Sequence, residues 1–150
     1  SVIKSVIKSN QNRSNLLLGK VFKILKNKIR NKRITFLGVT FKANTDDMRD
    51  SSSLKMIPAL SKKGAKINYF DPTGLKKELS RVKNVSYIDN IKESVKGSDL
   101  VIIHTEWNDF KSINFKNLVT GKKFIIYDMR NIYSPRKIKK QGFKYYSIGR

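Results

Sequence analysis

The chain has 150 residues, of which 33 are Lys or Arg and 11 are Asp or Glu, so its formal net charge is +22 at neutral pH. This length is typical of one domain, or of one domain with an appendage, and a hydrophobic content of 39% argues against global disorder. The absence of cysteine excludes a disulfide scaffold and a thiol nucleophile in these residues, and with one histidine we expect no metal site. No apolar run approaches the roughly 20 residues of a membrane helix, so we expect no transmembrane segment and no membrane partner.

The positive charge could attract a polyanion such as nucleic acid. However, 25 of the 33 cationic residues are lysines, scattered from Lys4 to Lys144, and the arginines are not interleaved with aromatic residues as in proteins that bind single strands. This pattern favours a lysine-rich solvated surface. A basic nucleic-acid-binding module stays open as an alternative.

Residues 2–28 have the apolar periodicity of a helix, in which Ile3, Leu17 and Val21 fall near one stripe. The cluster Asn10-Gln11-Asn12 weakens helix propensity there, so a break or kink could occur. A helix of this length before the first strand is expected to be an appendage of the minimal domain. The N-terminus has neither an initiator Met nor a secretory apolar block, so we expect these residues to come from the middle of a longer chain.

Beyond residue 30, short apolar runs typical of strands alternate with segments of helical periodicity. The predicted strands cover 33–39, 65–70, 85–88, 100–104, 124–127 and 143–148, and the predicted helices cover 51–63, 74–79, 90–96 and 135–140. This alternation predicts an α/β fold with a doubly wound, mainly parallel sheet of strand order 3-2-1-4-5-6, preceded by the long N-terminal helix. Ligands of such sheets bind beyond the carboxyl ends of the strands, near the point where the strand order reverses.

The segment Phe41–Ser53 follows the first predicted strand and therefore falls at this edge. Gly38 is the one glycine nearby, so the Gly-x-Gly-x-x-Gly turn that cradles a dinucleotide pyrophosphate is missing. The loop instead contains Lys42, a point charge suited to phosphate, and Arg49, a planar fork suited to phosphate or carboxylate. A solvated loop in which the acidic residues pair with Arg49 is the alternative interpretation.

Two further loops reach the same edge. His104 and Glu106 follow the fourth strand and could suggest acid–base chemistry, but a single histidine there is more often structural. Arg130 follows the fifth strand and could reach the same pocket as Lys42. The alternative for Arg130 is a surface salt bridge to Asp128, which would contribute little.

Several motifs carry a resemblance, and they occur in this order: Gly38–Ser51, Gly64-Ala65, Tyr69-Phe70-Asp71-Pro72, Thr105-Glu106-Trp107, Asp128-Met129-Arg130-Asn131 and Ile148-Gly149-Arg150. Together they resemble the C-terminal domain of the UDP-glucose/GDP-mannose dehydrogenase family, almost without gaps from about Asn10 to Arg150. The Thr-Glu-Trp and Ile-Gly-Arg elements are more similar to the UDP-glucose 6-dehydrogenase branch than to the GDP-mannose or UDP-N-acetylmannosamine relatives, which stay open as alternatives.

The resemblance implies a cytoplasmic, homodimeric enzyme of three parts. An N-terminal Rossmann domain holds NAD, a central helical domain carries the catalytic cysteine and the dimer contact, and a C-terminal Rossmann-like domain holds the nucleotide end of UDP-glucose. Such an enzyme oxidises the sugar C6 alcohol twice to UDP-glucuronate for polysaccharide biosynthesis, through a cysteine-bound thiohemiacetal and thioester, and passes two hydrides to NAD. The cysteine and the NAD domain are missing from these 150 residues, so we expect no catalytic residue here and no activity from the chain alone.

The resemblance also assigns residues. Phe41 and Lys42 match the substrate-contacting pair of the family, and Arg130 matches an arginine that contacts the UDP-sugar. Arg49 matches the arginine that reaches across the domain interface to NAD. Met129 stands where the family more usually has Gly, which limits the freedom of that loop.

By the same resemblance, residues 1–30 match the end of the long helix of the central domain, and 31–150 match the UDP-sugar-binding domain. This division would explain an apolar helical stripe without a partner in the chain. Asp46 and Asp47 are expected to hold the two cations of their loop in place, and Asp71-Pro72 is expected to form a turn.

Overall fold

The computed structural model describes residues 2–149, apart from the side chains of Ile3 and Ile7. Its centre is a six-stranded sheet of order β3-β2-β1-β4-β5-β6, in which every neighbouring pair is parallel. The strands are β1 (Arg33–Leu37), β2 (Lys66–Phe70), β3 (Val85–Tyr87), β4 (Leu100–Ile103), β5 (Ile125–Asp128) and β6 (Tyr145–Ser147). The predicted doubly wound α/β fold and its strand order are therefore confirmed.

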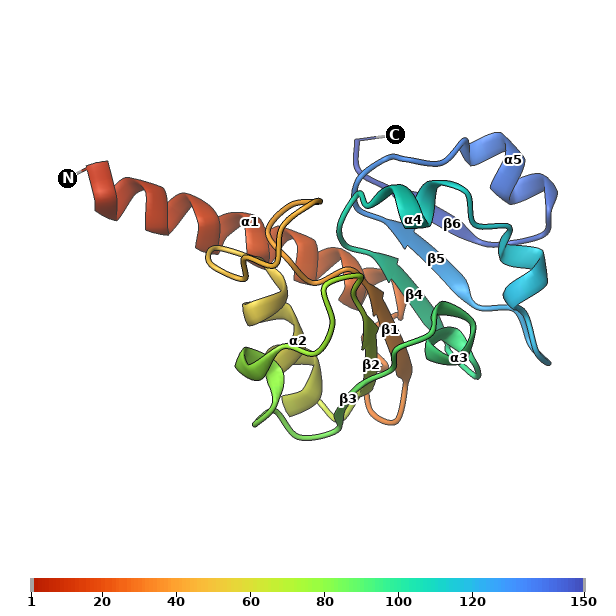
Figure 1. The fold of residues 1–150 in the computed structure, drawn as a ribbon, viewed down its shortest axis with the longest axis horizontal. Coiled ribbons are helices and arrows are strands. Elements are labelled where there is room, and N and C mark those ends of the chain that lie inside the picture. Colours follow the sequence, from red (N-terminus) through yellow and green to blue (C-terminus); the bar gives the residue numbers. More distant parts are fainter. Residues whose placement is uncertain (1, 150) are drawn as a thin grey trace.

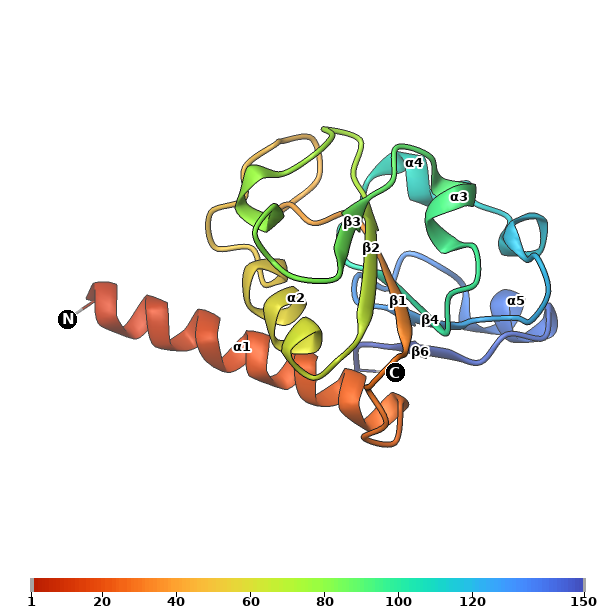
Figure 2. The ribbon, with the colours of Figure 1, turned by 90° about the horizontal axis from the view of Figure 1, so that it is seen from below.

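The helices cover both faces of this sheet (Figures 1 and 2). They are α1 (Val2–Ile24), α2 (Ser53–Lys62), α3 (Ile91–Val95), α4 (Asn108–Lys111) and α5 (Pro135–Lys140), with the short 3₁₀ helices η1 (Lys77–Leu79) and η2 (Phe115–Leu118). Helices α1 and α2 pack on one face, and α3, α4, η2 and α5 pack on the other. No helix within residues 2–149 has the length and apolarity needed to cross a bilayer.

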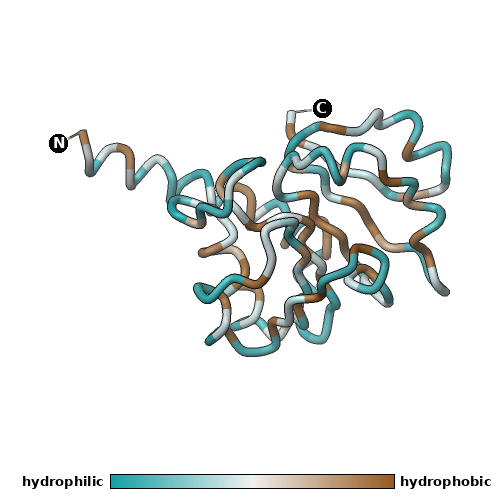
Figure 3. Tube along the Cα trace, viewed as in Figure 1, coloured by the Kyte–Doolittle hydropathy of each residue, from teal (hydrophilic) through white to brown (hydrophobic). Residues whose placement is uncertain are grey.

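Side chains of β1 show how one strand serves both cores. Successive side chains of a strand point to opposite faces, so Ile34 and Phe36 join the core under α1 and α2, whereas Leu37 joins the core under the other helices. All four residues of β4 are buried because this strand is covered on both faces. Figure 3 shows the consequence along the chain, with hydrophobic positions gathered in the sheet region and hydrophilic ones in the loops.

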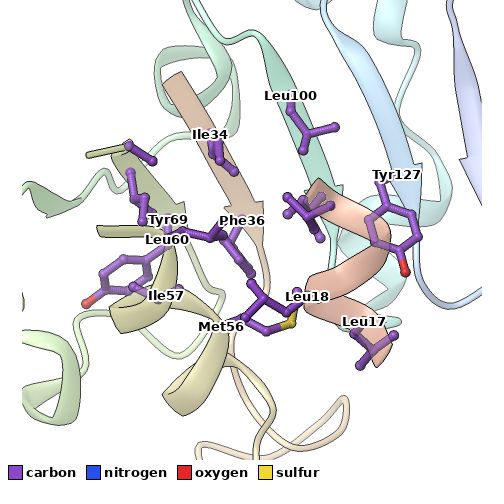
Figure 4. Packing of buried hydrophobic residues seen from close by; sticks show 14 of the residues in the cluster. Leu17, Leu18, Ile34, Phe36, Met56, Ile57, Leu60, Tyr69, Leu100 and Tyr127 are labelled. Carbon is purple, nitrogen blue, oxygen red and sulfur yellow. The ribbon is translucent and has the colours of Figure 1, made fainter. Parts of the chain in front are cut away.

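Helix α1 consists of two halves with different surroundings. Leu17, Leu18 and Val21 of its second half belong to the buried core on this face, and Figure 4 shows Leu18 beside Met56 of α2. The first half projects beyond the sheet in both views, and its Val2 side chain is 80% exposed. The expected apolar stripe without a partner is therefore wrong for the second half of the helix, which belongs to the core.

Other differences from the expected elements are local. Helix α1 is continuous through Asn10-Gln11-Asn12, so no break occurs there. The helix predicted over 74–79 is the single 3₁₀ turn η1. Helices α4 and η2 were not predicted, because segments of four residues are too short to show helical periodicity.

Candidate functional site

The exit of β1 is fixed by neighbouring strands. Gly38 has a φ of +79°, and a Cβ added there would lie 2.6 Å from the Cβ and the Oγ1 of Thr105. The next residue, Val39, donates its backbone N–H to Asp71 Oδ2 at 2.9 Å. The buried Asp71 carboxylate also accepts the backbone N–H of Thr73 at 2.9 Å, so it holds a turn after β2, as its motif predicted.

The loop after β1 closes on its own start. Ser51 and Ser53 both donate their hydroxyls to the Val39 carbonyl at 2.6 Å, and the Phe41 N–H donates to the Asp47 carbonyl at 3.0 Å. These bonds bring the entrance of α2 back to the end of β1. The loop between them is therefore held at the carboxyl edge of the sheet, where the strand order reverses.

A cavity of about 340 Å³ opens at this edge, between α1 and the loops after β1, β4 and β5. Its lining residues are Asn10, Arg13, Ser14, Phe41, Lys42, Asp50, Ser52, His104 and Arg130. Of these described residues three are cationic and one, Asp50, is acidic, so the cavity favours an anion. Lys42 and Arg130, which follow different strands, meet here because the carboxyl ends of parallel strands share one edge.

Arg130 is oriented by backbone carbonyl groups. Its Nε donates to the carbonyl of His104 at 2.9 Å, and its Nη2 donates to the carbonyl of Phe41 at 3.1 Å. Burial lowers the pKa of Arg130 from its ordinary value, but a guanidinium in a protein stays protonated. The half-buried positive charge is thus held against the cavity by two carbonyls of its own wall.

The alternative of a salt bridge between Arg130 and Asp128 is wrong. The buried Asp128 carboxylate accepts the backbone N–H of Arg130 at 3.0 Å, the Tyr145 hydroxyl at 2.6 Å and the Tyr133 N–H at 3.1 Å. Asp128 therefore stabilises the turn that contains Arg130 through backbone bonds, and the Arg130 guanidinium lines the cavity.

His104 is a neutral residue of the cavity wall. Its Nε2 lies 2.8 Å from the Ser52 hydroxyl, and its Nδ1 lies 3.1 Å from Oγ1 of Thr105. The Thr105 hydroxyl donates to the Thr40 carbonyl, so the network is satisfied when Nδ1 carries the proton and Nε2 accepts from Ser52. Burial, reinforced by two nearby arginines, lowers the pKa of His104 to about 3. The geometry supports the structural interpretation of this histidine.

Arg49 lies apart from the other two predicted cations. Its Nε and Nη2 donate to the two carboxylate oxygens of Asp47 at 3.0 and 2.9 Å, and these bonds lower the pKa of Asp47 to about 2. The Arg49 side chain is 88% exposed and does not line the cavity. The structure thus brings Phe41, Lys42 and Arg130 together and leaves Arg49 on the outer surface, paired as the solvated-loop interpretation expected.

Sequence reasoning missed the wall contributed by α1. Asn10, Arg13 and Ser14 stand at positions i, i+3 and i+4, so they share one helix face. Positions 17, 18 and 21 continue this face into the core. The signal was present in the sequence, as a polar cluster in register with the apolar stripe.

The fold and the cavity define the class, a doubly wound α/β domain with a cationic pocket at its switch point. The model of the "UDP-glucose/GDP-mannose dehydrogenase family, UDP binding domain" matches residues 35–135. A UDP-glucose 6-dehydrogenase of Rickettsia felis is 39% identical over 152 residues, covering 99% of this chain and 34% of the relative. That of Rhizobium meliloti is 35% identical over 150 residues, again covering 99% and 34%.

Among solved structures, a UDP-glucose dehydrogenase from the hyperthermophilic archaeon Pyrobaculum islandicum superposes with a TM-score of 0.75 at 23% identity, over 95% of this chain and 31% of that chain. This likeness concerns the fold. The chain belongs to the UDP-glucose/GDP-mannose dehydrogenase family and contains its UDP binding domain. It spans about a third of the length of the curated relatives that it matches.

Proposed function

We propose that the chain is the UDP-sugar-binding C-terminal portion of a UDP-glucose 6-dehydrogenase, and that the cavity receives the diphosphate of UDP-glucose. The observation that carries this proposal is the convergence of Lys42 and Arg130 on one hollow. The volume of about 340 Å³ lies at the small end of ligand sites, which suits a part of a nucleotide sugar whose remainder contacts other domains of the parent enzyme.

The lining residues have distinct parts in this proposal. Lys42 is exposed and supplies a mobile point charge to a phosphate oxygen. Arg130 supplies a fixed planar donor set, because two carbonyls already orient it. Phe41 is 48% exposed at the rim, where its ring can pack on the sugar or the base. These residues bind and orient the substrate, and the chemistry is carried out by groups outside this chain.

NAD does not fit this sheet in the manner of a dinucleotide-binding domain. The backbone at Gly38 is packed against Thr105 and Phe110, so no glycine turn is open to a pyrophosphate. When the parent enzyme binds NAD, the cofactor serves as the hydride acceptor. We place its binding site on a separate domain. The exposure of Arg49 supports a contact from this chain to that cofactor.

The remaining parts of the proposal concern the parent. It is a cytoplasmic homodimer whose N-terminal and central domains hold NAD and the catalytic cysteine. The isolated chain then reduces no NAD when UDP-glucose is added. In the full-length parent, Arg49→Ala is expected to raise the KM for NAD, whereas the affinity of the present chain for UDP stays the same.

The experiment is a calorimetric titration of UDP and of GDP into the chain. We expect weak binding of UDP, at least tenfold weaker binding after Lys42→Ala or Arg130→Lys, and no change after Lys116→Ala, which removes an exposed charge of η2 away from the cavity. A preference for GDP would instead favour the GDP-mannose branch.

The net charge of +22 is the observation that favours a second candidate, a nucleic-acid-binding module. This candidate requires salt-sensitive retention of duplex DNA that survives Lys42→Ala, together with the absence of UDP binding. Asp46, Asp47 and Asp50 in the loop beside the cavity disfavour a phosphate-backbone groove there.

A further inference from the structure

The cavity wall formed by α1 lies outside the residues matched by the family model, which begin at 35. Ser14 is buried on this wall and Asn10 is half-buried, while Arg13 stands between them with an exposed side chain. All three lie on the same helix face, and the next turns of that face are anchored in the core by Leu17 and Val21. The position of Arg13 at the cavity is therefore set by packing and does not depend on a flexible terminus.

The charge of Arg13 acts on the site. Arg13 lines the same cavity as His104 and Arg130, and its charge adds to the burial that lowers the pKa of both groups. Within the described part of the chain, the side chain of Arg13 has no carboxylate oxygen within 4.0 Å, unlike Arg49, which is held by Asp47. A guanidinium beside an anion-favouring cavity, without a counter-ion, is available to a ligand.

We propose that Arg13 is a substrate-binding residue that donates hydrogen bonds to a phosphate of the nucleoside diphosphate from the α1 side of the cavity. The inference rests on the proposed function and adds a third cation to Lys42 and Arg130. A diphosphate carries more than one negative charge, and an arginine fork matches two of its oxygens at once. Helix α1 is then a part of the site, and the ligand is enclosed between the helix and the loops after β1 and β5.

The test compares UDP with uridine, which has the base and ribose but no phosphate, by NMR titration of the 150-residue chain. We expect Arg13→Ala to weaken UDP binding about tenfold, the effect of losing a charge-assisted hydrogen bond, and to leave uridine binding unchanged. The affinity of Arg13→Lys for UDP should fall between that of the unmodified chain and that of Arg13→Ala. Lys8→Ala is the matched control, because it removes one charge from an exposed position of α1 that does not line the cavity, and its effect should stay below about twofold.

The outcomes separate the two proposals. If the unmodified chain binds no UDP, the proposed function fails and the role of Arg13 fails with it. If the chain binds UDP and Lys42→Ala weakens this binding, but Arg13→Ala behaves like Lys8→Ala, only the inference about Arg13 is overturned. An equal loss for UDP and uridine in Arg13→Ala also overturns it, since a phosphate contact cannot affect uridine. An unchanged thermal unfolding midpoint of each variant ensures that the comparison concerns binding.

Discussion

At the scale of single residues, His104 makes stability depend on pH. The side chain is 1% exposed, and its pKa of about 3 lies below the ordinary value of 6.5. Between these values the unfolded chain binds a proton that the folded chain does not, so the free energy of unfolding decreases as the pH falls from 6.5 toward 3. At pH 5 the loss from this one group is about 2 kcal/mol.

We therefore expect urea unfolding of the unmodified chain to show this loss between pH 7 and pH 5, and His104→Gln to show a loss smaller by about 2 kcal/mol. Glutamine can still hydrogen-bond with Ser52 but does not titrate. The carboxyl groups contribute equally to both proteins and cancel in the comparison. Identical pH profiles would mean that the folded state admits a protonated His104.

Gly38 is a second residue whose contribution to stability can be tested by substitution. Gly38→Ala places a Cβ 2.6 Å from the Thr105 side chain, whereas Gly74 has a similar positive φ but no atom within 4 Å of an added Cβ. Gly74→Ala should therefore cost only the backbone strain, about 1 kcal/mol, and Gly38→Ala about 3 kcal/mol or more. Equal free energies of unfolding for the two variants would show that Thr105 moves freely.

Some of these residue properties could be predicted from the sequence, and others could not. Lys42 and Arg130 follow strands that a doubly wound sheet ends at one edge, so their convergence was predictable. The carbonyl partners of Arg130 were not, because a hydrogen bond to the backbone of Phe41, 89 positions away, leaves no trace in residue types. For the same reason the role of Asp128 as a buried acceptor was missed.

At the scale of elements, substitutions of two adjacent leucines test whether α1 contributes to the stability of the domain. Leu17 is 5% exposed in the core, whereas Leu16, about 100° away around the helix, is 77% exposed. We expect Leu17→Ala to lower the free energy of unfolding by about 2–4 kcal/mol and Leu16→Ala to change it by less than about 0.5 kcal/mol. Chemical denaturation measures both. Similar small values would mean that α1 is an appendage, as the sequence alone suggested.

The elements also show where pattern reasoning succeeds. The apolar runs at 100–103 and 124–127 predicted β4 and β5, and burial on both faces of the sheet favours such runs. The second half of α1 was misjudged because periodicity identifies an apolar face but not what covers it. Helices α4 and η2 depend on tertiary contacts of Phe110 and Phe115, which are fully buried, rather than on local periodicity.

At the scale of the whole molecule, the net charge of +22 opposes the compact state through self-repulsion. Raising the NaCl concentration from 50 to 500 mM shortens the screening length, so we expect a higher thermal unfolding midpoint. The triple variant Lys83→Gln, Lys92→Gln and Lys116→Gln changes three exposed positions and lowers the charge to 22 − 3 = +19. Its midpoint should rise less with salt. A midpoint that falls with salt in the unmodified chain would show that surface attractions dominate.

The junction between the projecting and the anchored half of α1 has a geometric consequence. An α-helix turns by about 100° and advances about 1.5 Å for each residue. The number of residues between two positions therefore sets the angle between their side chains around the helix axis. If one residue were inserted between Arg13 and Leu17, the core residues of α1 would stay in place. Asn10 and Arg13 would then rotate by about 100° around the helix axis, away from the cavity. The spacing between the cavity-lining residues and the core residues of α1 therefore fixes which side of the helix faces the cavity.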